Sequence, residues 1–75
     1  MNPILMRQMQ KRAKELEEEI ARCEAEIADS ESQLAQFKSQ EESARLGRLL
    51  KDRRTSLEEL WKEWEDVSQG IEYGR

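Results

Sequence analysis

Residues 13–37, AKELEEEIARCEAEIADSESQLAQF, decide the fold, because their apolar side chains recur at alternating steps of three and four. This spacing forms the a/d seam of a heptad repeat, the edge along which one α-helix packs on another. The seam extends back to Met6, and Ser30 is its one polar member. A helix over about residues 3–37 is therefore predicted. The first seam comprises Met6, Met9, Ala13, Leu16, Ile20, Cys23, Ile27, Ser30, Leu34 and Phe37.

A second seam with the same steps occupies the other half of the chain, and Arg53 is its polar member. It predicts a helix over about residues 40–70, a turn at about 38–40 and a frayed tail at 71–75. Long helices joined by so short a turn must run antiparallel. Residues 1–75 thus form one domain, an all-α two-helix antiparallel coiled-coil hairpin. The second seam comprises Leu46, Leu50, Arg53, Leu57, Leu60, Trp64, Val67 and Ile71.

Local chemistry marks the helix ends. Asn2 is an N-cap residue, and Pro3 suits the first helical turn, where its missing N–H has no intrahelical partner. Ser39 and Glu42 have the spacing of a capping box at the start of the second helix. Gly70 is a candidate C-terminal stop because glycine readily leaves the helical conformation.

One register satisfies both seams. If Phe37 faces Ser43, each later layer pairs an a residue with a d residue, ending with Met9 against Ile71. The rod would then be about 50 Å long, at about 1.5 Å per residue. The structural core is predicted to comprise Leu16, Ile20, Ile27, Leu34, Leu50, Leu57, Leu60 and Trp64.

Composition argues against catalysis. The chain is 40% charged, has no histidine and has one cysteine, Cys23. The usual proton shuttle, a Cys/His nucleophile pair and a Cys/His metal site therefore cannot form. We expect no enzymatic activity, no metal and no cofactor, and Cys23 is interpreted as a small hydrophobic residue. The longest apolar run is Ile4–Leu5–Met6, too short for a membrane span, so a cytoplasmic location is expected.

A basic stripe on the second helix is the strongest functional signal. Arg45, Arg48, Lys51 and Arg54 recur every third residue, and Lys38 lies nearby at the turn. Arginine and lysine side chains suit phosphate oxygens, so these five residues are predicted to bind nucleic acid without sequence specificity. The alternative is a solvated face whose positive charges neutralise the nearby acidic residues Glu41, Glu42 and Asp52. Because the net charge is −4, any binding must be directed by this patch.

Other residues invite more than one interpretation. Trp61, on the flank of the seam, either laps over the core or serves as an exposed anchor for another protein. Arg53 is expected to snorkel from the seam toward Glu24 or Glu31. A glycine inside a helix, such as Gly47, lowers helix stability by about 1 kcal/mol relative to alanine, so Gly47 marks either a close approach by a partner or a flexible tip.

A second basic cluster lies at the open end of the hairpin, the end opposite the turn. It is expected to neutralise Glu65 and Asp66, and it comprises Arg7, Lys11, Arg12 and Lys14.

Five segments resemble a known family. The chain begins Asn2-Pro3-Ile4, and its second half carries Arg45-Leu46-x2-Leu49-Leu50-x2-Arg53-Arg54. With the other segments, these resemble the C-terminal coiled-coil domain of the ABC-F ATPases, Uup-like members included. The departures are Cys23, where leucine is commoner in the family, and Trp61, where tyrosine is common. The remaining segments are Leu16-x3-Ile20-x2-Cys23-Glu24-x2-Ile27, Phe37-x-Ser39-x-Glu41-Glu42 and Leu57-x2-Leu60-x3-Trp64-Glu65.

The resemblance implies a hairpin attached behind two ATP-binding cassettes, in proteins that act on the ribosome or bind DNA. Expected partners are therefore nucleic acid or the ribosome, the cassettes of the same parent chain and, as an alternative, a second copy in a homodimer. The chain has no Gly-x4-Gly-Lys-[Ser/Thr] phosphate loop, so ATP binding by these residues is not expected. The chain would then be a C-terminal fragment, and Met1 would not be the natural first residue.

Overall fold

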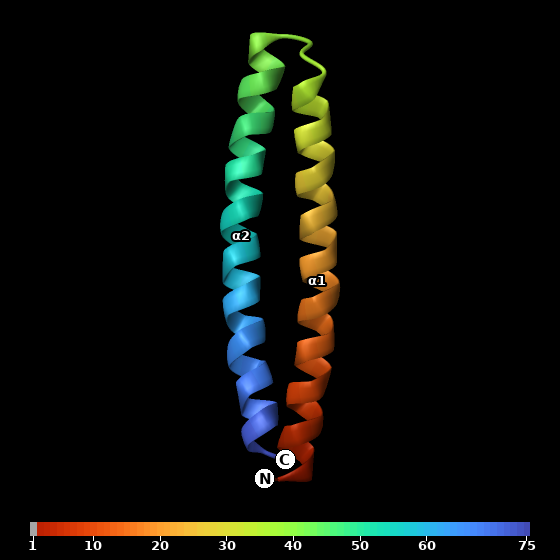
Figure 1. Ribbon diagram of the computed structural model, residues 1–75, viewed down its shortest axis with the longest axis vertical. Helices are drawn as coiled ribbons and strands as arrows, with labels where there is room; N and C mark the ends of the chain where they lie inside the picture. Colours follow the sequence, from red (N-terminus) through yellow and green to blue (C-terminus); the bar gives the residue numbers. More distant parts are fainter. Residues whose placement is uncertain (1) are drawn as a thin grey trace.

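The protein is a rod of two antiparallel helices. The computed structural model describes residues 2–75, so Met1 lies outside the described residues. Helix α1 spans Pro3–Ala35 and helix α2 spans Gln40–Tyr73, and the two lie side by side with both termini at one end (Figure 1). The rod measures 55 × 14 × 14 Å. The predicted all-α hairpin is confirmed. Neither helix has a stretch long and apolar enough to cross a membrane.

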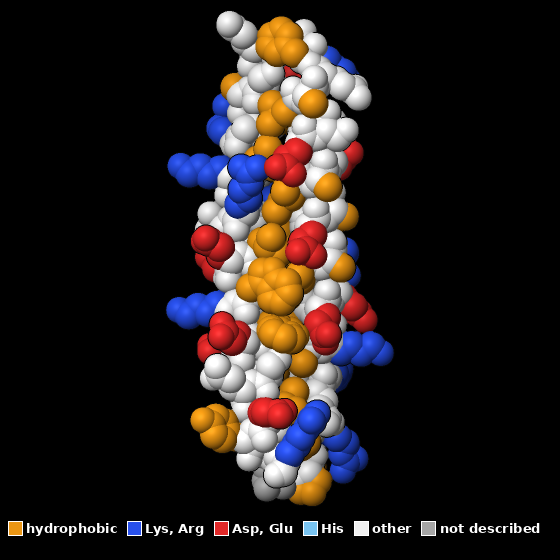
Figure 2. All heavy atoms as spheres, in the orientation of Figure 1, with side chains coloured by type: hydrophobic (Ala, Val, Ile, Leu, Met, Phe, Trp, Pro, Cys, Tyr) orange, Lys and Arg blue, Asp and Glu red, His pale blue; other side chains and the backbone are white. Residues whose placement is uncertain are grey.

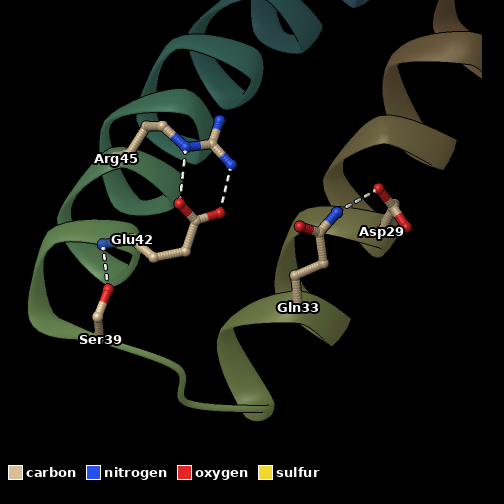
Figure 3. A network of polar contacts seen from close by, with 5 residues as sticks. All are labelled: Asp29, Gln33, Ser39, Glu42 and Arg45. Carbon is tan, nitrogen blue, oxygen red and sulfur yellow. Dashed lines mark hydrogen bonds and ion pairs between the residues drawn. The ribbon is translucent and has the colours of Figure 1, made fainter.

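Both helices begin at the predicted caps. The Ile4 N–H donates to Asn2 Oδ1 at 2.8 Å, and the Glu42 N–H donates to Ser39 Oγ at 3.0 Å (Figure 3). Only this half of the capping box is seen, because the Glu42 carboxylate turns to Arg45. Each cap satisfies a backbone donor that the helix itself leaves unpaired.

The first helix ends two residues earlier than predicted. It stops at Ala35, and residues 36–39 cross to α2. Helix axes in contact lie about 8–10 Å apart, so four residues must leave the helical path to cover that gap. Phe37 leaves the seam and is 68% exposed. Its predicted packing against Ser43 is therefore wrong.

The second helix runs three residues further than predicted. It continues through Gly70 to Tyr73, and Ile71 is 9% exposed. A Cβ added at Gly70 would lie 3.0 Å from the Met9 Cε atom, so the glycine permits α1 and α2 to approach closely here. Burial of Ile71 favours continuation of the helix over a glycine stop. The prediction of a frayed tail is wrong for residues 71–73.

The core is a single seam. Of the predicted core residues, Leu16 is 0% exposed, and Ile20 and Leu50 are also buried. The other five are half-buried, because two helices cover the seam only from opposite sides. Figure 2 shows apolar side chains along the line between the helices, flanked by acidic and basic ones. The half-buried members are Ile27, Leu34, Leu57, Leu60 and Trp64.

Contacts between the helices lie next to the predicted pairs. Met9 meets Gly70, one residue from its predicted partner Ile71. Glu26 approaches Arg53 at 3.2 Å, one residue from the predicted partner Ile27. A heptad seam pairs its flanking residues in this way, so the contacts agree with the register deduced from the two seams.

Candidate nucleic-acid interface

The basic stripe lies on an exposed side of α2, near the turn. Its four members, Arg45, Arg48, Lys51 and Arg54, are exposed, and so is Lys38 in the connection between the helices. Residues 36–54 carry six Lys or Arg and three Asp or Glu. We call residues 36–39 the tip; the tip and the first four turns of α2 form a locally basic segment of the chain.

Two members of the stripe are held by carboxylates of the same chain. Arg45 donates to Glu42 at 2.6 and 3.2 Å, as Figure 3 shows. This bidentate pair raises the pKa of Arg45 and lowers the pKa of Glu42, mainly through the side-chain hydrogen bonds. Arg54 reaches across to Glu31 on α1 at 2.9 Å. Both guanidinium groups are thus partly neutralised before any ligand arrives.

The other three basic residues are unpaired. Among residues 2–75, no carboxylate lies within 4.0 Å of the charged nitrogens of Lys38, Arg48 or Lys51. The five residues predicted together therefore fall into two classes. The pairing of Arg45 has a signal in the sequence, since Glu42 precedes it by three residues on the same helix face. The pairing of Arg54 with Glu31 depends on how the helices meet.

Phe37 is a tip residue that the sequence pattern had placed in the core. The residue is 68% exposed, and the next residue in the chain is Lys38. Figure 2 shows an apolar side chain at the upper end of the rod, above basic side chains on α2. An exposed aromatic ring beside unpaired cations is the combination that binds single-stranded nucleic acid.

Trp61 both laps over the seam and stays accessible. Its ring meets Trp64 edge to face, with centroids 5.5 Å apart and planes at 84°. Edge-to-face contact is a favoured arrangement of aromatic pairs. The Trp61 residue nevertheless remains 44% exposed. Trp61 therefore packs on a seam residue and still leaves apolar surface exposed.

Comparisons with protein-family models, curated proteins and solved structures found no match.

At the open end, one arginine joins the two helices. Arg12 donates to both Glu63 carboxylate oxygens, at 2.7 and 2.9 Å, and lies 3.8 Å from Glu19. The hydrogen bonds to Arg12 lower the pKa of Glu63. The basic cluster of Arg7, Lys11, Arg12 and Lys14 was expected to neutralise Glu65 and Asp66. The acidic residue that accepts hydrogen bonds from Arg12 is instead Glu63, whose position flanks the seam.

Arg53 adopts a different orientation from the one expected. Its guanidinium lies 3.2 Å from Glu26 and 3.6 Å from Asp52, and the predicted contacts with Glu24 or Glu31 do not form. The Nε atom is buried and lacks an aligned hydrogen bond among residues 2–75, although Glu26 is close. The seam therefore holds a charged group that is only partly satisfied.

Cys23 behaves as a seam residue. It is buried, and its thiol donates to the Arg53 carbonyl at 3.2 Å. Burial raises the pKa of this thiol, which favours the unreactive protonated form. Residues 2–75 hold no group of three or more Cys, Asp or Glu arranged to bind a metal ion.

Proposed function

We propose that this hairpin is a non-catalytic arm that contacts DNA or ribosomal RNA through its basic end. The observation that carries the proposal is the set of three unpaired cations near the turn. Lys38, Arg48 and Lys51 are exposed, and no carboxylate of residues 2–75 holds them. Such groups bind phosphates by releasing counterions, without reading the base sequence.

Charge is distributed unevenly along the rod. Residues 55–75, which include the second half of α2, carry two Lys or Arg and six Asp or Glu, while the facing start of α1 carries the basic cluster Arg7, Lys11, Arg12 and Lys14. Exposed charges act over about 8–10 Å at moderate salt, while the rod is 55 Å long. Charges at the two ends of the rod therefore act on a nucleic acid separately, and the proposed contact is made by the unpaired cations near the tip.

The resemblance to ABC-F ATPases supports the further proposal that this arm belongs to a larger protein. In this part of the proposal, the hairpin follows two ATP-binding cassettes of one parent chain. The cassettes would hydrolyse ATP, and the rigid rod would carry the contact to nucleic acid some 50 Å away from its attachment. The antiparallel fold supports such a role, because it puts both termini at the end opposite the basic tip (Figure 1).

Charge reversal at the tip tests the nucleic-acid proposal. We expect the triple variant Lys38→Glu, Arg48→Glu and Lys51→Glu to bind a 20-mer at least about tenfold more weakly in fluorescence anisotropy at 50 mM salt. The plot of log affinity against log salt for the natural chain should have a slope of about −2 to −3, as for three phosphate contacts.

The matched control reverses three exposed lysines elsewhere: Lys11, Lys14 and Lys62. It changes the net charge by the same amount, so a general electrostatic effect would weaken binding equally in both variants. Loss confined to the tip variant supports the proposal. If the tip variant binds as well as the natural chain, or if both variants lose affinity alike, the stripe is not the interface.

A protein-interaction or self-association role is the second candidate, and the exposure of Trp61 favours it. The seam beside this ring is half-buried, so another helix would cover apolar surface there. Either a second copy or the parent's cassettes would be the partner. Sedimentation at 10–100 µM distinguishes the two: a homodimer that Trp61→Ala dissociates supports self-association. A strict monomer that also fails to bind separately produced cassettes contradicts this candidate.

A further inference from the structure

Phe37 occupies a position that the fold does not explain. The heptad pattern would bury its ring in the seam, yet α1 ends at Ala35 and the residue is 68% exposed. Exposure of a phenylalanine forgoes about 1.5–3 kcal/mol of burial free energy. Sites where local pattern and fold disagree are often functional sites.

Gly47 gives a second, independent indication of a ligand near the tip. It lies in the interior of α2, where glycine costs about 1 kcal/mol relative to alanine. A Cβ added there would meet nothing within 4 Å, so no contact within the hairpin requires a glycine. Gly70 differs, since the Met9 side chain fills the space beside it. Glycine without an internal reason suits close approach of a ligand to the backbone.

We propose that the tip binds unpaired nucleotides, with one base stacked on the Phe37 ring and phosphates of the same strand held by Lys38, Arg48 and Lys51. This rests on the proposed nucleic-acid function and names its substrate as single-stranded or looped DNA or RNA. Stacking on an aromatic ring requires a base with a free face, which duplex interiors lack. Since every base has such a face, the contact is tolerant of sequence.

The dimensions suit a short stretch of strand. Arg48 and Lys51 follow the start of α2 by eight and eleven residues, or about 12 and 16 Å along the helix axis. At about 3.4 Å per stacked nucleotide, this distance corresponds to four or five nucleotides. A strand of four or five nucleotides therefore spans the part of α2 between its start and these two cations.

Removing the ring tests the proposal. We expect Phe37→Ala to weaken binding of a 12-nucleotide single strand about 5- to 100-fold, as base stacking on aromatic side chains implies. Binding of a blunt 12-base-pair duplex should change by less than about twofold. Phe37→Leu, which keeps an apolar side chain without a π-face, should lose most of the same affinity, and Phe37→Trp should retain it.

Two matched controls isolate the role of the ring. Tyr73 is 90% exposed at the open end, so Tyr73→Ala removes an equally accessible aromatic far from the tip and should leave affinity unchanged. An abasic strand offers the same phosphates without bases, and the natural chain and Phe37→Ala should bind it equally.

Gly47→Ala is a variant in which we expect the stability of the fold to rise and the affinity for the single strand to fall. It should raise the thermal midpoint, because alanine favours the helix and meets no neighbour. Its affinity for the single strand should nevertheless fall.

The outcomes separate the two proposals. If Phe37→Ala and Phe37→Leu bind strand and duplex as the natural chain does, base stacking is wrong while the phosphate-binding function stands. If the tip charge reversal leaves binding intact, the nucleic-acid function itself is wrong. Equal losses on strand, duplex and abasic strand would show that Phe37 only shapes the tip, which also overturns base stacking.

Discussion

Leu16→Ala is expected to lower the free energy of unfolding by about 2–5 kcal/mol, the largest effect of any single truncation proposed for this chain. Leu16 is 0% exposed and is the most deeply buried large side chain among residues 2–75. Its removal costs the transfer free energy of the lost carbons and leaves a cavity in the seam. A two-helix domain has a thin core, so this loss would leave a substantial unfolded fraction at 25 °C. Urea unfolding followed by circular dichroism measures it.

Leu5→Ala provides the control for that prediction. Leu5 is a leucine on the same helix but is 45% exposed, so its truncation should change stability by less than about 1 kcal/mol. Both substitutions introduce alanine and affect helix propensity alike. Equal losses in the two variants would contradict the seam as the source of stability.

Arg53→Leu is expected to raise the free energy of unfolding by about 1–2 kcal/mol. The arginine sits in the seam with a buried Nε atom that lacks an aligned hydrogen bond among the described residues, although its side chain is 36% exposed overall. Replacing a charged group that is partly buried in an apolar seam by an apolar one of similar size is often stabilising. Glu26 and Asp52, which it approaches, are exposed and would be solvated in the variant. The thermal midpoint should rise by about 4–16 °C, as calorimetry would show.

The same substitution should reduce structural specificity. A charged seam residue fixes register and oligomeric state, and an uninterrupted apolar seam permits helices to slide or to recruit further copies. We expect Arg53→Leu to form oligomers in sedimentation at concentrations where the natural chain does not change state. Arg22→Leu, an exposed arginine on α1, is the control and should leave both properties nearly unchanged. A less stable Arg53→Leu would show that the guanidinium contributes net stability.

The fold was accessible from the sequence because its determinants are local and periodic. Leu16 and Ile20 repeat at helical spacing in α1, as Leu46 and Leu50 do in α2, and all four are buried. Asn2 and Ser39 were recognisable as caps, since capping depends on a side chain and the next few backbone donors. The helix ends at Ala35 and Tyr73 were not recognisable, because they depend on the gap between helices and on burial of Ile71.

The candidate site was only partly accessible from the sequence. The spacing of Arg45, Arg48, Lys51 and Arg54 predicted exposed positions along one helix, and each of the four is exposed in the structure. The spacing alone did not indicate which of these positive charges remain unpaired and free to bind a ligand. The tertiary pairing of Arg54 with Glu31 removed one, and the exposure of Phe37 added a residue that the heptad pattern had assigned to the core.

The sequence alone was enough to establish that this chain forms two antiparallel helices in one register. Hydrophobic periodicity, caps and turn length were sufficient, because caps and turns depend on residues near in sequence and the register depends on a heptad repeat that both halves share. Only the tertiary structure decided which charged and aromatic side chains face solvent without a partner. That outcome depends on distances between residues such as Arg12 and Glu63, which lie 51 positions apart and meet only after the chain has folded back.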